Sequence, residues 1–129
     1  MFRLVAAAAA IVFFSFSVSA DELSDAVKKD YDDYLWPLFD HFHRNPELSL
    51  IETDTAARMA RELRAAGFEV TENVGGTGVV AMLENGDGPL VMMRADMDGL
   101  PVEEKSGLEN ASRKTQIDPI TGNEVFTMH

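Results

Sequence analysis

The sequence predicts an α/β fold in which helices pack on a mixed sheet. Two amphipathic helical patterns, over residues 24–44 and 50–66, precede a series of short extended segments. In Leu90–Pro101, an apolar run leads directly into Asp96 and Asp98 and then into chain-breaking residues. Such a run is typical of a buried strand, and open α/β sheets bind ligands at the carboxyl ends of their strands. The sequence therefore places a candidate site at the end of this strand.

The first helical pattern carries apolar residues at spacings of three and four, which form one stripe. Pro37 interrupts the pattern, so the helix is expected to kink there or to be followed by a second helix. Asn45-Pro46 ends it. We expect the large side chains of the stripe to lie in the core: Val27, Tyr31, Tyr34, Leu35, Leu38, Phe39 and Phe42.

The second helical pattern has clear signals at both ends. Ser49 and Glu52 have the spacing of a capping box, which predicts a helix that begins near Leu50. Gly67 is typical of the residue that follows a helix.

The remaining segments read as short strands and turns. Residues 68–71 and 77–83 are expected to be extended, and 85–88 has the composition of a hairpin turn. The strand at 90–93 would then run antiparallel to its predecessor. Residues 125–128 begin another extended segment.

The N-terminus has the features of a secretory signal. A positive Arg3 precedes the apolar run Leu4–Phe16, and Val18-Ser19-Ala20 is typical of a cleavage site. The apolar run is too short to span a bilayer, so no stable membrane anchor is expected, although a membrane-anchored N-terminus is the alternative. We therefore expect 1–20 to be a signal peptide, 21–129 to be the mature chain, and the location to be periplasmic or secreted.

Charge and cysteine content exclude several classes of protein. The chain has 22 acidic and 11 basic residues and a net charge of −11, which argues against nucleic acid and anionic membranes as partners. It contains no cysteine, so it holds neither a disulfide nor a thiolate zinc ligand.

Asp96 and Asp98 are two residues apart, so on a strand their side chains point to the same face. Like charges at such close range repel, and a buried pair would need a cation or a shared proton. The alternative is a solvated turn that contains two ordinary acids.

Three further patterns suggest other chemistry. Residues 76–81 match a dinucleotide-binding pattern, but β-branched residues follow the glycines, which favours a loop that enters a strand. His41 and His43 resemble a metal pair, but residues two apart on a helix do not share a face, so surface or capping roles are expected. Asp96-Met97-Asp98-Gly99 resembles the signature of haloacid dehalogenase-like phosphatases, although Leu100-Pro101 replaces the usual Thr-Leu.

An ordered series of motifs carries a more specific resemblance. It comprises His43-Arg44-Asn45-Pro46-Glu47-Leu48-Ser49, Ala66-Gly67-Phe68-Glu69-Val70, Gly75-Gly76-Thr77-Gly78-Val79-Val80-Ala81 and Arg94-Ala95-Asp96-Met97-Asp98-Gly99-Leu100-Pro101. The series resembles the N-terminal part of the hippurate hydrolase-like amidohydrolases. They belong to the metallopeptidase family that includes aminoacylases and zinc carboxypeptidases. Gly99 stands where that family usually has Ala.

The resemblance implies a hydrolase that cleaves the amide bond of small N-acyl amino acids or small peptides. It further implies a divalent metal centre, with zinc or manganese, and a homodimer of the full-length enzyme. The fold would be a zinc-exopeptidase-like catalytic domain, of which 21–129 supplies the first, incomplete portion.

The resemblance also assigns roles to residues near the candidate site. Met128-His129 begins the family's metal-binding motif, whose ligands would lie beyond His129. Asp98 would contact a metal ligand and hold it in orientation without binding the metal itself. Asp96 would lie beside Asp98, and His129 would lie at the rim of the site. None of these residues is expected to bind the metal directly, and this chain alone is expected to be inactive. A non-enzymatic acidic secreted module remains a further alternative.

Overall fold

The structure is a computed structural model, and it describes residues 20–129. The predicted signal peptide falls almost entirely on 1–19, outside the described residues. Within 20–129, no helix combines the length and the apolar character needed to cross a membrane.

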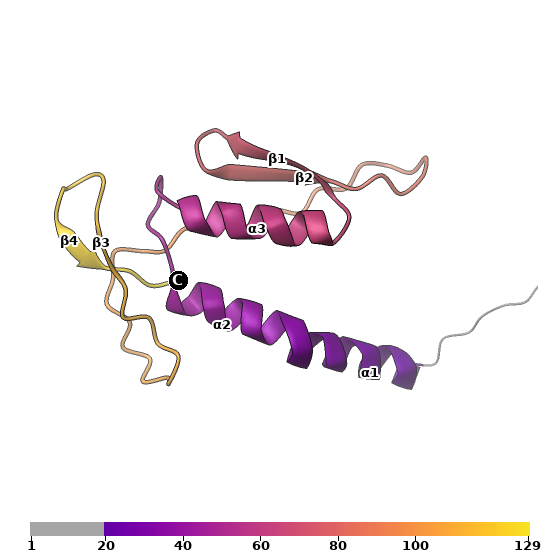
Figure 1. Cartoon of the computed structure of the whole chain (residues 1–129), viewed down its shortest axis with the longest axis horizontal. Coiled ribbons are helices and arrows are strands. Elements are labelled where there is room, and N and C mark those ends of the chain that lie inside the picture. Colours follow the sequence, from indigo (N-terminus) through magenta and orange to yellow (C-terminus); the bar gives the residue numbers. More distant parts are fainter. Residues whose placement is uncertain (1–19) are drawn as a thin grey trace, which may run out of the picture.

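The N-terminal helical pattern forms one long rod (Figure 1). It consists of α1 (Ala20–Asp30), the π-helical segment η1 (Tyr31–Leu35) and α2 (Trp36–Arg44). Pro37 lies in the first turn of α2. The N–H of Trp36 donates to the carbonyl of Tyr31, so the rod is continuous, but Pro37 has no N–H to donate and the regular helical bonding is interrupted there. The predicted interruption at Pro37 is therefore confirmed as the start of a second α-helical segment.

Helix α3 (Thr53–Ala65) lies alongside the rod, and its C-terminal end follows the prediction (Figure 1). Gly67 has a φ of 91°, a conformation that glycine adopts at little cost. The N–H of Phe68 donates to the carbonyl of Leu63 at 3.1 Å, and the N–H of Gly67 donates to the carbonyl of Arg64 at 3.0 Å. This pair of bonds is a Schellman motif, which ends the helix and satisfies two of its last carbonyls.

The prediction of a capping box at 49–52 was wrong. Leu50 has a φ of 76°, so the chain turns there and the helix begins only at Thr53. No side-chain hydrogen bond comes from the N-cap residue. Instead, the Oε2 atom of Glu47 accepts the N–H of Thr55 at 2.6 Å. A carboxylate from the preceding turn therefore satisfies a free donor in the first turn of α3.

Two antiparallel hairpins complete the regular structure. Strands β1 (Glu69–Val74) and β2 (Gly78–Met82) pair on the side of α3 that faces away from α2 (Figure 1). Strands β3 (Thr115–Ile117) and β4 (Glu124–Phe126) form the second hairpin. Asp118 holds the turn between them by accepting the N–H of Ile120 at 2.9 Å. The predicted extended segments around 68–71, 77–83 and 125–128 are confirmed within one to three residues at each end.

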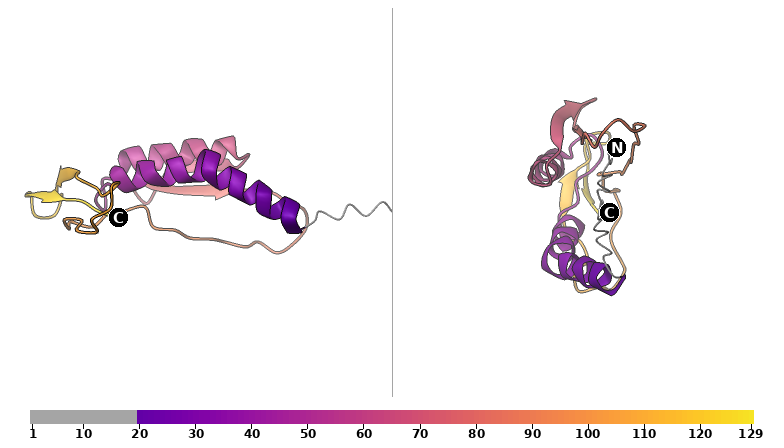
Figure 2. Two further views of the ribbon diagram at one scale, coloured as in Figure 1. Left: turned by 90° about the horizontal axis from the view of Figure 1, so that it is seen from below. Right: turned by 90° about the vertical axis from the view of Figure 1, so that its right-hand side faces the viewer.

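The prediction of a buried strand at Leu90–Met93 was wrong. These four residues are irregular and 80–95% exposed. Figure 2 shows the segment as part of a long loop that runs beside the helices. A strand needs a neighbour for its backbone N–H and C=O groups, and no other segment of 20–129 pairs with this one.

The aromatic stripe of the rod was also wrongly expected to be core. Within the described residues only Leu38 and Phe42 of the stripe are partly buried, because α3 covers just one side of the rod. The buried apolar residues are few and mostly small: Leu48, Ala56, Ala60 and Ala111. Helices that pack with short strands nevertheless place the chain in the predicted α/β class, which is confirmed.

Candidate functional site

Three segments that are far apart in the sequence meet at one junction, formed by 46–48, 99–100 and 127–128. Leu48 pairs in parallel with Gly99, and Leu100 pairs in antiparallel with Met128. The N–H of Gly99 donates to the carbonyl of Glu47 at 2.6 Å. Leu100 and Met128 exchange two backbone bonds of 2.7 and 3.1 Å. The junction thus combines parallel and antiparallel pairing, as in a mixed sheet.

Gly99 lies at the crowded centre of this junction and is buried. A Cβ atom added there would lie 2.8 Å from Thr127 Cγ2, and 3.0 Å from both the carbonyl oxygen of Met128 and Pro46 Cβ. Such contacts are shorter than carbon atoms tolerate, so the close approach of the three segments depends on a residue without a side chain.

The three predicted site residues lie on the two chain segments that leave this junction. Asp96 is exposed and forms an ion pair with Arg94. Asp98 is half-buried, directly before Gly99. Both aspartates line a cavity of about 310 Å³. Asp96 and His129 line a second cavity, of about 380 Å³. Asp96 therefore stands between the two cavities.

The glycine-rich residues 74–78 also line the smaller cavity. Thr77 Oγ1 donates to Glu52 Oε2 at 2.5 Å, which ties this loop to the start of α3. The loop leads into β2 and not into a helix, as expected. Because a dinucleotide-binding loop must open a helix, this arrangement does not support nucleotide binding there.

The larger cavity lies between α2, α3 and the segment that carries Asp96. Aromatic and apolar side chains make up most of its wall. Its lining residues are Phe39, Phe42, His43, Pro46, Thr55, Met59, Asp96, Met97 and His129.

His43 is not the surface residue that the sequence suggested. Its ring stacks on Phe39 with centroids 5.6 Å apart, and its Nε2 atom lies 3.1 Å from Oε1 of Glu104. The two interacting side chains are 14% and 3% exposed. His41 does remain exposed. Sequence reasoning missed the pair because its partners are 61 residues apart and Glu104 lies in an ordinary polar stretch.

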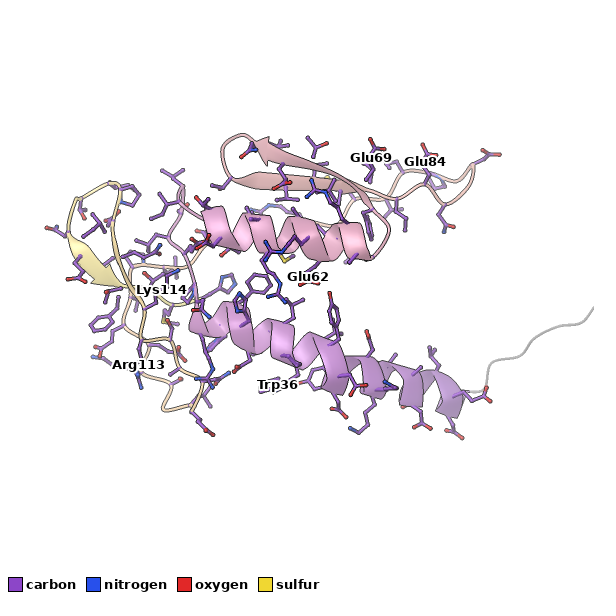
Figure 3. All side chains as sticks on the ribbon, in the orientation of Figure 1. Trp36, Glu62, Glu69, Glu84, Arg113 and Lys114 are labelled. Atoms are coloured by element: carbon purple, nitrogen blue, oxygen red, sulfur yellow. The ribbon has the colours of Figure 1, made fainter. Side chains whose placement is uncertain are left out.

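Glu104 accepts further hydrogen bonds from its own loop. The hydroxyl of Ser106 and the N–H of Ser112 each donate to its carboxylate at 2.5 Å. These donors, with His43, hold the pKa of Glu104 below its usual value of 4.5 because they stabilise the charged form. Arg113 and Lys114 follow on the same loop, near the C-terminal end of α2 (Figure 3).

The described residues do not form a complete metal site. Within 20–129, no three His, Asp or Glu side chains lie close enough together to hold one ion. A catalytic zinc ion needs about three protein ligands. Asp96, Asp98 and His129 are divided between two cavities, so no step of catalysis by a metal follows from these residues alone.

Comparisons with known proteins place the chain in a family, although no family model matches it. It is 44% identical over 89 residues to a protein of Synechocystis that is named a probable hydrolase. It is 40% identical over 86 residues to the hippurate hydrolase of Campylobacter jejuni. It is 44% identical over 98 residues to thermostable carboxypeptidase 2 of Saccharolobus solfataricus.

These matches cover 67%, 66% and 74% of this chain, but only 23%, 22% and 25% of the respective relatives. The chain thus spans about a quarter of the length of the curated relatives that it matches. A putative amidohydrolase of Bacillus subtilis is also 39% identical to it over 88 residues. The names of these relatives agree in describing hydrolases, among them an amidohydrolase and a carboxypeptidase. This chain therefore belongs to the amidohydrolase and carboxypeptidase family of hydrolytic enzymes.

Proposed function

We propose that the whole protein is a metal-dependent amidohydrolase that cleaves the amide bond of N-acyl amino acids or small peptides. The junction is the observation that carries this proposal. It brings together the segments that begin with His43, Arg94 and Met128, each of which resembles a motif of the same hydrolase family. Relatives named hippurate hydrolase and carboxypeptidase support this class of substrate.

A divalent metal, zinc or manganese, would activate a water molecule and polarise the scissile carbonyl in the whole protein. We propose that its ligands come from residues other than 20–129. Asp98 would hold one of those ligands in orientation, Asp96 would lie beside it, and His129 would form the rim of the site. The half-buried position of Asp98, beside the tightly packed Gly99, supports a fixed orientation for its carboxylate.

Replacing Asp98 tests this assignment. Asp98→Asn in the whole protein should lower metal affinity or hydrolysis of hippurate roughly 10–100-fold, the usual effect of losing a partner that orients a metal ligand. Asp87→Asn, the same change at an exposed residue, is the matched control and should leave both unchanged. An Asp98→Asn protein with unchanged metal content and hydrolysis would remove Asp98 from the site.

The comparisons do not favour the phosphatase alternative, since the relatives reported above do not include a phosphatase. Magnesium-dependent phosphatase activity that is abolished by Asp96→Asn would reverse this conclusion. A cooperative unfolding transition of residues 21–129 alone, without hydrolase activity in the whole protein, would instead favour a non-enzymatic module.

We also propose export to the periplasm or the medium, on the basis of Arg3, the apolar run Leu4–Phe16 and the small residues at 18–20. The mature protein should begin at Asp21. N-terminal sequencing of exported protein that still begins at Met1 would contradict this. The homodimer implied by the family resemblance is likewise a proposal, and light scattering of the purified whole protein tests it.

A further inference from the structure

Glu104 is the most deeply buried carboxylate among the described residues. Groups from several parts of the chain contact it at once. The residue is 4% exposed. His43 contacts it from the last turn of α2, and Ser106 and Ser112 donate to it from the loop that follows Glu104 in the sequence. Burying a charged group is unfavourable unless donors surround it, so these three contacts are required for the carboxylate to remain at this position.

A second hydrogen bond extends from Ser112 to the junction. The Ser112 hydroxyl donates to the carbonyl of Thr127 at 2.8 Å. Both residues are almost fully buried, with exposures of 3% and 1%, so water has little access to replace this bond. Thr127 directly precedes Met128, whose backbone pairs with Leu100. Glu104 is thus connected, through one intervening serine, to the chain that carries His129.

We propose that Glu104 is a positioning residue of the candidate site. Its carboxylate fixes Ser112, Ser112 fixes the carbonyl of Thr127, and this chain of contacts sets the position of His129 relative to Asp96 across the larger cavity. The role in catalysis rests on the proposed hydrolase function. The structural part, in which Glu104 controls the pairing of Leu100 with Met128, does not.

The chemistry of the contacts explains why a carboxylate occupies this position. Both of its oxygens only accept hydrogen bonds, and both are used: Oε1 faces Ser106 and His43, while Oε2 faces the N–H of Ser112. Glutamine would present an NH₂ group to one of these donors. Glu104→Gln therefore keeps the size of the side chain but leaves only one oxygen that can accept, so the three contacts can no longer all form.

Hydrogen exchange in the whole protein tests the structural part. In Glu104→Gln, the amides of Leu100 and Met128 should exchange about tenfold faster, because the junction opens more often. Ser112→Ala should produce the same local increase, since it removes the hydroxyl that donates to the carbonyl of Thr127 and accepts the N–H of Lys114, and leaves the backbone contact with Glu104. Amides of the β1–β2 hairpin should keep their rates in both variants.

Glu103→Gln is the matched control, because it makes the same substitution one residue earlier on an exposed side chain. It should change no exchange rate. If Glu104→Gln accelerates exchange equally throughout the protein, Glu104 is a general stabilising residue and the positioning role is wrong. If both Glu104→Gln and Ser112→Ala leave Leu100 and Met128 protected, the connection itself is wrong.

Steady-state kinetics with hippurate test the catalytic part. Displacing the segment that carries His129 should also displace the metal-binding motif that the family resemblance places after it. We therefore expect kcat to fall roughly tenfold or more in Glu104→Gln, with KM changed by less than about twofold, because misplacing groups at a reacting centre chiefly affects the chemical step. A change in KM alone would overturn the positioning role in catalysis. If the wild-type protein hydrolyses no N-acyl amino acid, the proposed function fails, whereas the exchange experiment still decides whether Glu104 controls the junction.

Discussion

Gly99 and Thr127 approach each other so closely that a Cβ atom on Gly99 would lie 2.8 Å from the methyl group of Thr127. The two residues belong to segments that are adjacent only in the folded chain. In this chain the methyl group of Thr127 occupies the space that an alanine side chain, usual at this position in the family that it resembles, would need.

We predict that Gly99→Ala destabilises the protein by about 1–3 kcal/mol, the usual effect of overpacking a buried position. The free energy of unfolding from urea titration measures this. Gly88→Ala is the matched control, because a Cβ atom there meets no other atom within 4 Å. The control should change stability by less than about 0.5 kcal/mol.

A second substitution shows whether Thr127 is the cause. Thr127→Ser removes the methyl group that makes the shortest contact, so Gly99→Ala should cost less in the Thr127→Ser background than in the wild type. The contacts of 3.0 Å with Met128 and Pro46 remain, so the rescue should be partial. Equal costs in the two backgrounds would contradict the proposed contact.

The start of α3 gives the next prediction. Glu47 accepts the N–H of Thr55, and both residues are buried. Glu47→Ala leaves that donor without a partner and should lower the free energy of unfolding by about 1–3 kcal/mol. Urea unfolding followed by circular dichroism measures the change.

Ser49→Ala is the control for this experiment. Ser49 has the spacing of a helix cap in the sequence, but it is exposed and makes no cap hydrogen bond in the structure. Its replacement should leave stability within about 0.5 kcal/mol of the wild type. A loss of about 1 kcal/mol from Ser49→Ala and none from Glu47→Ala would restore the capping box.

The features that could be predicted from the sequence are those that depend only on neighbouring residues. Pro37 and Gly67 each act within one helical turn, and Asp118 acts within its own turn, so their effects could be derived from neighbouring residues. The start of α3 could not be derived in this way. Its cap comes from Glu47 because Leu50 turns the chain, and nothing in the sequence around Leu50 indicates a positive φ.

The errors at the site have a different physical cause. Leu90–Met93 has the composition of a buried strand, but a strand also requires neighbours, and residues 20–129 supply none for it. His43 and Glu104 meet only because α2 ends beside the loop 104–112. Such a contact depends on the arrangement of whole segments. Asp96 and Asp98 do line one cavity, but Ala95 and Met97 line it as well, so the course of the whole segment places them there and not the alternation of a strand.

The lowered pKa of Glu104 makes stability depend on pH. Because the folded protein holds this carboxylate ionised more strongly than the unfolded chain does, its stabilising contribution is present above the ordinary pKa of 4.5 and is lost as the pH falls through the lower, folded value. Between pH 7 and pH 3, the free energy of unfolding should therefore decrease less in Glu104→Gln than in the wild type. Glu103→Gln should follow the wild-type curve.

The final prediction is that residues 21–129 alone bind no catalytic metal and hydrolyse no N-acyl amino acid. The described donors do not meet as a set of three, and Asp96 is already paired with Arg94. Two carboxylates without an imidazole or thiolate that completes a set of three ligands suit a hard cation and hold it loosely. Metal analysis after gel filtration in zinc or manganese should therefore find no stoichiometric ion, and a hippurate assay should give no product. The same assays on the whole protein should be positive. Tight zinc at one ion per chain in 21–129 would show that these residues carry a complete site of their own.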